Sequence, residues 1–179
     1  MAYLEIWLRD FAKDYLRRIS MEDHGYYPHI TLVRPFDISA NPAQVQQAIT
    51  SFCYGKKPIE FSLKGKETFE QGIHYIPVTS PELTMFNNDL EKLLETIPGI
   101  KLREKLADEK VLHVTIPRDF DGCYEIQEHM LRLTAIKDKK IWFSYDFVLQ
   151  KELNREKSLD RELWEQTKSQ FLQNPLAAG

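Results

Sequence analysis

The spacing of apolar residues along the chain predicts short strands interleaved with amphipathic helices. Alternating and β-branched apolar runs predict strands over residues 3–8, 29–33, 59–69, 73–78, 111–116 and 141–150. Apolar residues at helical spacing predict helices over residues 10–20, 41–53, 80–97, 121–135 and 158–173. Asn41 before Pro42 and Ser80 before Pro81 are typical of helix starts, because each pair joins a capping residue to a proline at the first helical position.

These elements occur in the same order twice. Residues 1–70 and 71–150 each read strand, helix, strand, helix, strand, and the helix over 158–173 follows. We therefore expect an α+β fold of two pseudo-symmetric lobes, each an antiparallel sheet with helices outside, and a cleft between the lobes. A chain of 179 residues fits one such bilobal domain over residues 1–179.

A short phrase is repeated on the middle strand of each half. Residues 29–32 read HITL and residues 113–116 read HVTI, and the two histidines are 113 − 29 = 84 residues apart. Successive side chains of a strand point to opposite faces, so His29 shares a face with Thr31 and His113 with Thr115. Chance predicts only about 0.04 such tetrapeptides in a chain of this composition, so the repeat indicates a functional site.

Composition and charge narrow the classes of function. The net charge of −3 argues against a protein that grips long nucleic acid, and a small or terminal phosphate ligand fits better. Cys53 and Cys123 form no CxxC motif, and we expect two unpaired thiols in a reducing cytoplasm. No apolar run approaches the roughly 20 residues of a membrane span. No close set of His, Cys and carboxylate residues accompanies either phrase, so neither a metal nor another cofactor is expected.

The two phrases, within a duplicated α+β unit, resemble the paired motifs of the two-histidine (2H) phosphoesterase superfamily. That group includes the bacterial and archaeal RNA 2′,3′-cyclic phosphodiesterases, also called 2′-5′ RNA ligases. The resemblance covers roughly residues 1–150, and PHITLVRPF (28–36) is close to the first motif. In the second motif a leucine precedes His113 where proline is more typical, which leaves the subfamily open.

The resemblance implies a metal-independent cyclic phosphodiesterase that opens a 2′,3′-cyclic phosphate of RNA or of a nucleotide to a 2′-phosphate. His29 would be the general acid and His113 the general base, while Thr31 and Thr115 would bind the phosphate; a different substrate orientation would exchange the two histidine roles. One imidazole can accept a proton from water while the other protonates the leaving ribose oxygen, and hydroxyl groups can donate to nonbridging oxygens.

Two alternatives to this function remain. One is a related enzyme that acts on 2′-5′ linkages or on ADP-ribose 1″,2″-cyclic phosphate. The other is a phosphate or RNA-end binding module without turnover. The intact His and Thr pairs argue against it, because binding alone would not require two titratable imidazoles.

Four further residues are candidates for substrate binding: Arg34, Arg118, Tyr27 and Tyr75. The two arginines follow the two histidines at equal offsets, yet strand parity places them on the opposite face unless Pro35 and Pro117 accompany a local twist. The aromatic residues could stack on a base, with packing in the core as the alternative. The sequence does not settle the physiological substrate or the oligomeric state.

Overall fold

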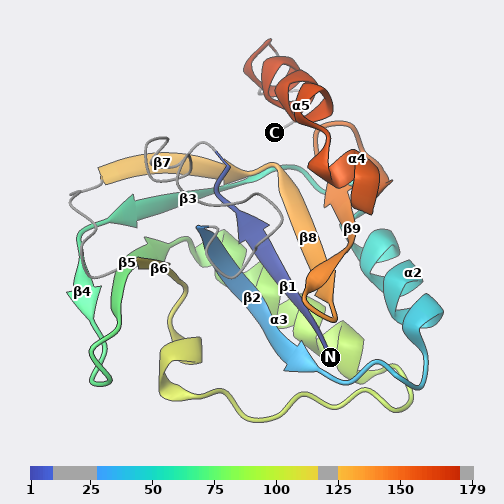
Figure 1. Ribbon diagram of the computed structural model, residues 1–179, viewed down its shortest axis with the longest axis horizontal. Coiled ribbons are helices and arrows are strands. Elements are labelled where there is room, and N and C mark those ends of the chain that lie inside the picture. The colour runs from blue at the N-terminus through green and yellow to red at the C-terminus, as the bar shows by residue number, and fades with distance from the viewer. Residues whose placement is uncertain (10–27, 117–124, 174–179) are drawn as a thin grey trace.

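The protein is built on one curled antiparallel sheet (Figure 1). The structure, a computed structural model, describes residues 1–9, 28–116 and 125–173. Hydrogen-bonded strands follow the order β10-β9-β8-β1-β2-β6-β5-β3-β7, and β4 pairs with β5. The strands are β1 (Ala2–Trp7), β2 (His29–Phe36), β3 (Ile59–Lys64), β4 (Glu67–Thr68), β5 (His74–Thr79), β6 (His113–Ile116), β7 (Glu125–Met130), β8 (Arg132–Lys137), β9 (Lys140–Asp146) and β10 (Lys151–Asn154).

The two halves of the sequence are interleaved in this sheet. Strand β3, from the first half, lies between β5 and β7, whereas β8 and β9, from the second half, continue the sheet beyond β1. The central junction is the pairing of β2 with β6, where Ile30 is opposite Val114. The α+β class and the antiparallel sheet are therefore confirmed, while the division into two lobes stays a prediction.

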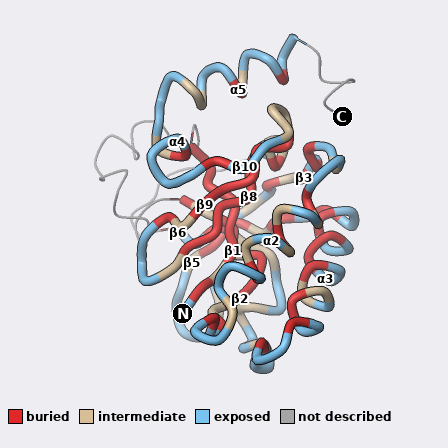
Figure 2. Tube along the Cα trace, turned by 90° about the vertical axis from the view of Figure 1, so that its right-hand side faces the viewer, coloured by how far each residue is buried: buried red, intermediate tan, exposed pale blue. Residues whose placement is uncertain are grey.

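Helices α2 (Pro42–Cys53) and α3 (Pro81–Glu95) cover one side of the sheet. Their buried residues join the side chains of β1, β2 and β3 in the main hydrophobic core, and Figure 2 shows the burial concentrated along the strands and the inner sides of these helices. Helices α4 (Arg155–Leu159) and α5 (Arg161–Gln173) follow β10. None of the helices in the described ranges combines the length and hydropathy that a bilayer crossing requires.

The start of α3 is fixed by its predicted cap. The Ser80 hydroxyl accepts a hydrogen bond from the Leu83 amide at 3.1 Å and donates to the Glu60 carbonyl at 2.8 Å, so it ties α3 to β3. Asn41 also precedes its helix, but its side chain makes no capping bond. Its side-chain amide donates to the Pro98 carbonyl instead. The sequence thus located both helix starts, and only the Ser80 side chain caps its helix.

Replacing Ser80 by alanine is expected to lower the free energy of unfolding by about 0.5–2 kcal/mol, because an amide of the first turn loses its acceptor. Denaturant titration measures this change. Ser51→Ala, at an exposed site in α2, is the matched control and should cost less. Equal stabilities of the two variants would contradict the capping role.

The prediction of a helix over 121–135 is wrong for the described part of this range, from Glu125 onward. Residues from Glu125 form β7, whose six residues pair with β3 along its whole length, and β8 lies between β1 and β9. Most of β8 is buried on both faces, so its sequence lacks the alternation that identifies a half-exposed strand. Tertiary pairing has overridden local periodicity here.

Other expected elements differ in their bounds. The strand expected over 59–69 is divided into β3 and β4 around Gly65, whose φ of +83° interrupts the ladder. The strand expected over 141–150 ends at Asp146, whose carboxylate accepts the amides of Val148 and Leu149 in a turn before β10. The final helix is divided into α4 and α5, with Asp160 between them. The helix expected over 10–20 lies outside the described residues.

Candidate active site

The two His-Thr phrases lie on adjacent antiparallel strands. Because Ile30 is opposite Val114, the antiparallel register sets His29 opposite Thr115 and Thr31 opposite His113. Ile30 and Val114 are fully buried on the far face, as the alternation predicted. His29 and His113 are therefore a diagonal pair; such neighbours are typically about 7–8 Å apart, and their Cβ atoms somewhat closer.

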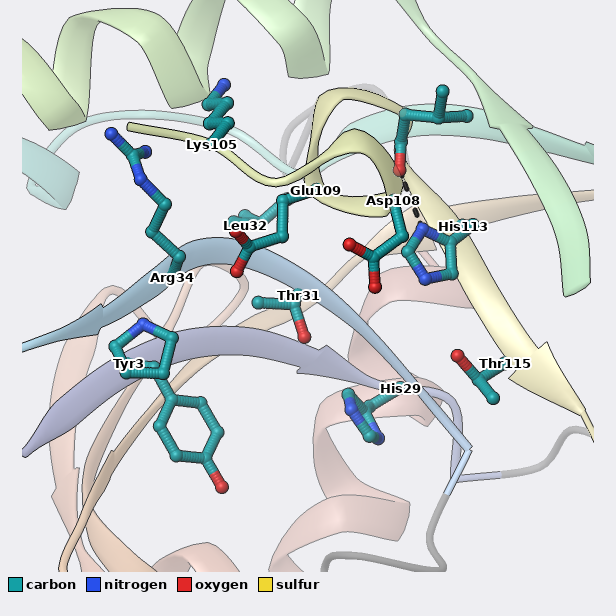
Figure 3. A pocket seen from close by; sticks show the side chains of 12 residues that line it. Tyr3, His29, Thr31, Leu32, Arg34, Lys105, Asp108, Glu109, His113 and Thr115 are labelled. Atoms are coloured by element: carbon teal, nitrogen blue, oxygen red, sulfur yellow. Dashed lines mark hydrogen bonds between the residues drawn. The ribbon is translucent and has the colours of Figure 1, made fainter. Parts of the chain in front are cut away.

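The four polar side chains open into one cavity of about 350 Å³. Figure 3 shows them turned toward a common space, with charged groups above them. The described lining consists of Tyr3, His29, Thr31, Leu32, Arg34, Pro35, Lys105, Asp108, Glu109, Val111, His113 and Thr115. The expected convergence of both phrases on one cleft is present, and the chemical roles of the four residues stay predictions.

The His113 ring is held in one tautomer. Its Nδ1 donates a hydrogen bond to the Val111 carbonyl at 2.7 Å, because a carbonyl oxygen can only accept (Figure 3). In the neutral ring Nε2 therefore carries the lone pair. An imidazole with a free Nε2 beside a cavity can accept a proton, as a general base must.

An aromatic pair supports this ring from the side. Phe69 and Tyr75 are stacked with centroids 3.8 Å apart, and both make edge contacts with His113, at 5.0 and 5.5 Å. The Tyr75 hydroxyl donates to Glu67 at 2.8 Å, and this hydrogen bond raises the pKa of the phenol. Tyr75, a candidate for base stacking, thus packs beside His113, opposite Thr115 on β6, and is not part of the cavity lining described above.

His29 lies beside a buried carboxylate. The Nε2 atom of His29 is 3.5 Å from Oε2 of Glu5, on the neighbouring strand β1. The side chain of His29 is 26% exposed and that of Glu5 is fully buried. Sequence reasoning missed Glu5, although a charged residue in the middle of the apolar strand 3–8 was a signal that could have found it.

Strand parity does not hold at Arg34, where a local irregularity of β2, the exception allowed for above, decides the face. Glu5 pairs with Thr31 but Leu4 pairs with Val33, so β2 has an extra residue, Leu32, at a β-bulge here, and a second register shift follows between Leu4 and Ala2. The bulge reverses the alternation, and Arg34 lies on the cavity side. Its guanidinium is already engaged, because it donates to Glu91 at 3.0 Å and to the Arg103 carbonyl at 2.6 Å.

The segment before β6 adds two acidic residues that the sequence did not single out. A 3₁₀ turn, η1 (Ala107–Lys110), brings Asp108 and Glu109 to the cavity, and Lys105 precedes it. Arg103 binds both oxygens of Glu109, at 2.6 and 2.8 Å, and holds the pKa of this carboxyl below its ordinary value. Both signs of charge therefore line the described part of the cavity.

A comparison with protein families now decides the affiliation. Residues 13–121, more than half of the chain and including both phrases, match the model of the 2′-5′ RNA ligase superfamily. The chain belongs to this superfamily. It is therefore a 2H phosphoesterase superfamily protein, as the HITL and HVTI phrases indicated, and members of this group are typically phosphodiesterases.

A structural relative supports the same fold for this superfamily member. The crystal structure of TT0787 of Thermus thermophilus matches with a TM-score of 0.51, covering 86% of this chain and 97% of that chain. The sequence identity is 11%, so this likeness bears on the fold alone. A search among curated proteins finds no matching sequence.

The two remaining candidates for substrate binding in this 2H phosphoesterase superfamily protein, Arg118 and Tyr27, lie outside the described residues, as do His24 and Cys123. His74 and His129 lie away from the cavity, bonded to Thr68 and paired with Glu60 respectively. Cys53 is a free, buried thiol whose burial raises its pKa to about 12.

The described ranges hold no group of three or more His, Cys, Asp or Glu side chains arranged to bind a metal ion. Metal independence stays a prediction that chelation can test.

Proposed function

We propose that this protein is a metal-independent cyclic phosphodiesterase that hydrolyses a 2′,3′-cyclic phosphate to a 2′-phosphate. The substrate would be a small nucleotide or an RNA end in the cytoplasm. One observation carries the proposal: His29, Thr31, His113 and Thr115 occupy one face of two paired strands and line one cavity. We also propose that the parts of the curled sheet on either side of the β2–β6 junction act as two lobes about this cavity.

The proposed proton transfers follow from the surroundings of the two rings. Nε2 of His113 takes a proton from water as the water oxygen bonds to phosphorus, and the bond from phosphorus to the ribose 3′ oxygen breaks. His29, beside the Glu5 carboxylate, gives its proton to that leaving oxygen. Each ring ends in the opposite protonation state, and proton exchange with solvent restores both.

The hydroxyl groups of Thr31 and Thr115 would donate to the nonbridging phosphate oxygens, where negative charge increases in the transition state. Replacing either threonine by alanine is expected to lower kcat about 10–10³-fold, because each removes one donor among several. Steady-state kinetics on a cyclic nucleotide measures the change. Thr→Ser at the same site keeps the hydroxyl and should retain most of the activity; equal losses in the serine and alanine variants would count against the hydroxyl role.

Catalysis by two imidazoles makes a prediction about pH and metals. The rate should fall at low pH, where His113 is protonated, and at high pH, where His29 has lost its proton, giving a bell-shaped profile near neutrality. Activity should also survive a strong chelator. Complete loss in the chelator, reversed by a divalent ion, would point to a metal-dependent phosphodiesterase instead.

A turnover assay tests the proposal against its alternatives. The panel contains nucleoside 2′,3′-cyclic phosphates, an oligonucleotide with a cyclic end, a 2′-5′ linked dinucleotide and ADP-ribose 1″,2″-cyclic phosphate. The double variant His29→Ala, His113→Ala is the control. Turnover of only the last two substrates would favour the related enzymes, and binding without turnover on the whole panel would favour the binding module.

A further inference from the structure

Glu5 is a buried carboxylate with an incomplete set of partners. It lies in the middle of β1 with none of its surface exposed. Its Oε1 accepts a hydrogen bond from the Trp7 indole at 2.5 Å. Its Oε2 makes no hydrogen bond within the part of the chain that the structure describes, and the nearby His29 Nε2 is 3.5 Å away.

Such a group is costly for a fold. A carboxylate removed from water is unfavourable unless charges and hydrogen bonds around it compensate, and an apolar residue of similar size is often more stable at such a site. Burial raises the pKa of Glu5, while the positive charge of His29 and the Trp7 hydrogen bond lower it. A perturbed carboxylate beside a cavity histidine is a frequent feature of functional sites.

We propose that Glu5 is a positioning residue for His29, which orients the ring and keeps a proton on the Glu5–His29 pair. This inference rests on the proposed function, in which His29 protonates the leaving oxygen. It adds to that function a reason why His29, and not His113, is the acid. His113 donates Nδ1–H to a neutral carbonyl, whereas His29 faces a group that can carry negative charge.

The pair holds one proton in either of two forms: a carboxylate beside an imidazolium, or a carboxylic acid beside a neutral imidazole. Because both forms contain the same proton, the two groups titrate together. During turnover that proton passes to the ribose oxygen and leaves the pair with a single negative charge. Solvent then returns a proton to the pair, while His113 releases the one it took from water.

The neighbours of Glu5 within residues 1–9, 28–116 and 125–173 come from β1 and the two strands beside it. On β1 its neighbours on the same face are Tyr3 and Trp7, and its strand partners are Thr31 on β2 and Thr134 on β8. Tyr3 is the only one of these four that can titrate. Burial and the charge of Glu5 raise the pKa of its phenol, so Tyr3 adds no charge near neutral pH. On β8 the charged residue nearest Thr134 on the same face is Arg132, whose guanidinium is paired with Asp146.

Glu5→Gln tests the inference, because glutamine keeps the size and an acceptor for Trp7 but removes the charge and its proton. We expect kcat to fall about 10–100-fold with little change in KM. The high-pH limb of the rate profile should move to lower pH, since the imidazolium loses its neighbouring anion. The melting temperature should stay the same or rise, because a buried charge has been removed.

A matched control is available in the same fold. Glu60 lies 3.4 Å from His129, outside the cavity, and its side chain is 60% exposed. Glu60→Gln therefore removes a carboxylate from a similar histidine pair and should leave kcat and the pH profile of the enzyme unchanged.

Nitrogen-15 NMR of the His29 ring gives a second readout that needs no turnover. In Glu5→Gln the Nε2 resonance of His29 should move, because the neighbouring carboxylate is gone, and in Glu60→Gln it should not move. An unmoved His29 Nε2 resonance in Glu5→Gln would overturn the inference. If the wild-type protein turns over no cyclic phosphate but this resonance does move, the pairing stands and the proposed function fails.

Discussion

Replacing His29 or His113 by alanine is expected to lower kcat/KM for a 2′,3′-cyclic nucleotide by about 10²–10⁴-fold, the usual contribution of a positioned proton donor or acceptor. Each ring lies on the face of its strand that lines the cavity. The buried neighbours Ile30 and Val114 pack into the core from the other face. The fold should therefore survive both substitutions. Steady-state kinetics gives the activity, and circular dichroism with thermal melting gives the integrity of the fold.

His74→Ala is the matched control, because His74 also lies on a strand of the sheet but bonds to Thr68 away from the cavity. Its activity should remain within a few-fold of wild type. The double variant His29→Ala, His113→Ala should lose less than the product of the two single losses, since the two rings act in one step. A folded single variant with wild-type kcat/KM would exclude that histidine from the chemistry.

The second large effect concerns stability. Asp146→Ala is expected to lower the free energy of unfolding by about 3–5 kcal/mol, because it leaves a buried guanidinium without its counter-ion. The Asp146 carboxylate is fully buried and accepts from Arg132 Nε at 2.7 Å and from the Thr167 hydroxyl at 2.7 Å. Through Thr167 it also joins α5 to the sheet. Its other oxygen accepts the two amides of the turn before β10.

Denaturant unfolding measures this loss. Asp138→Asn removes an ion pair of similar type at the surface, between Asp138 and the amino terminus, where the two groups are 78% and 63% exposed. Asparagine suits the positive φ of 51° at this position as aspartate does. Exposed pairs contribute little, so this control should change the stability by less than about 1 kcal/mol. Similar values for the two variants would show that the buried network does not hold α5 as we infer.

The predictable part of this molecule is local in the sequence. Strict alternation around His29 and His113 gave the strands, the shared face of each His and Thr, and the buried positions of Ile30 and Val114. Proline after a serine gave the start and cap of α3. These features depend on the preferences of a few neighbouring residues, which the sequence carries directly.

The missed features depend on contacts between distant segments. β7 and β8 were predicted as a helix because their partners, β3, β1 and β9, are not visible in local periodicity. The bulge at Leu32, which turns Arg34 to the cavity, arises from the register between β1 and β2. The proximity of Glu5 to His29 also results from the pairing of β1 with β2. Loop packing brings Asp108 and Glu109 to the site, and strand patterns contain no signal for it.

The central claim is that His29 and His113 together open a 2′,3′-cyclic phosphate, and phosphorus NMR of the reaction tests it most directly. A nucleoside 2′,3′-cyclic phosphate is incubated with the protein in the presence of a chelator. We expect the cyclic resonance to be replaced by that of the 2′-phosphomonoester, and to persist with the double alanine variant. Persistence of the cyclic resonance with the wild-type protein, or its conversion by the double variant, would contradict the account.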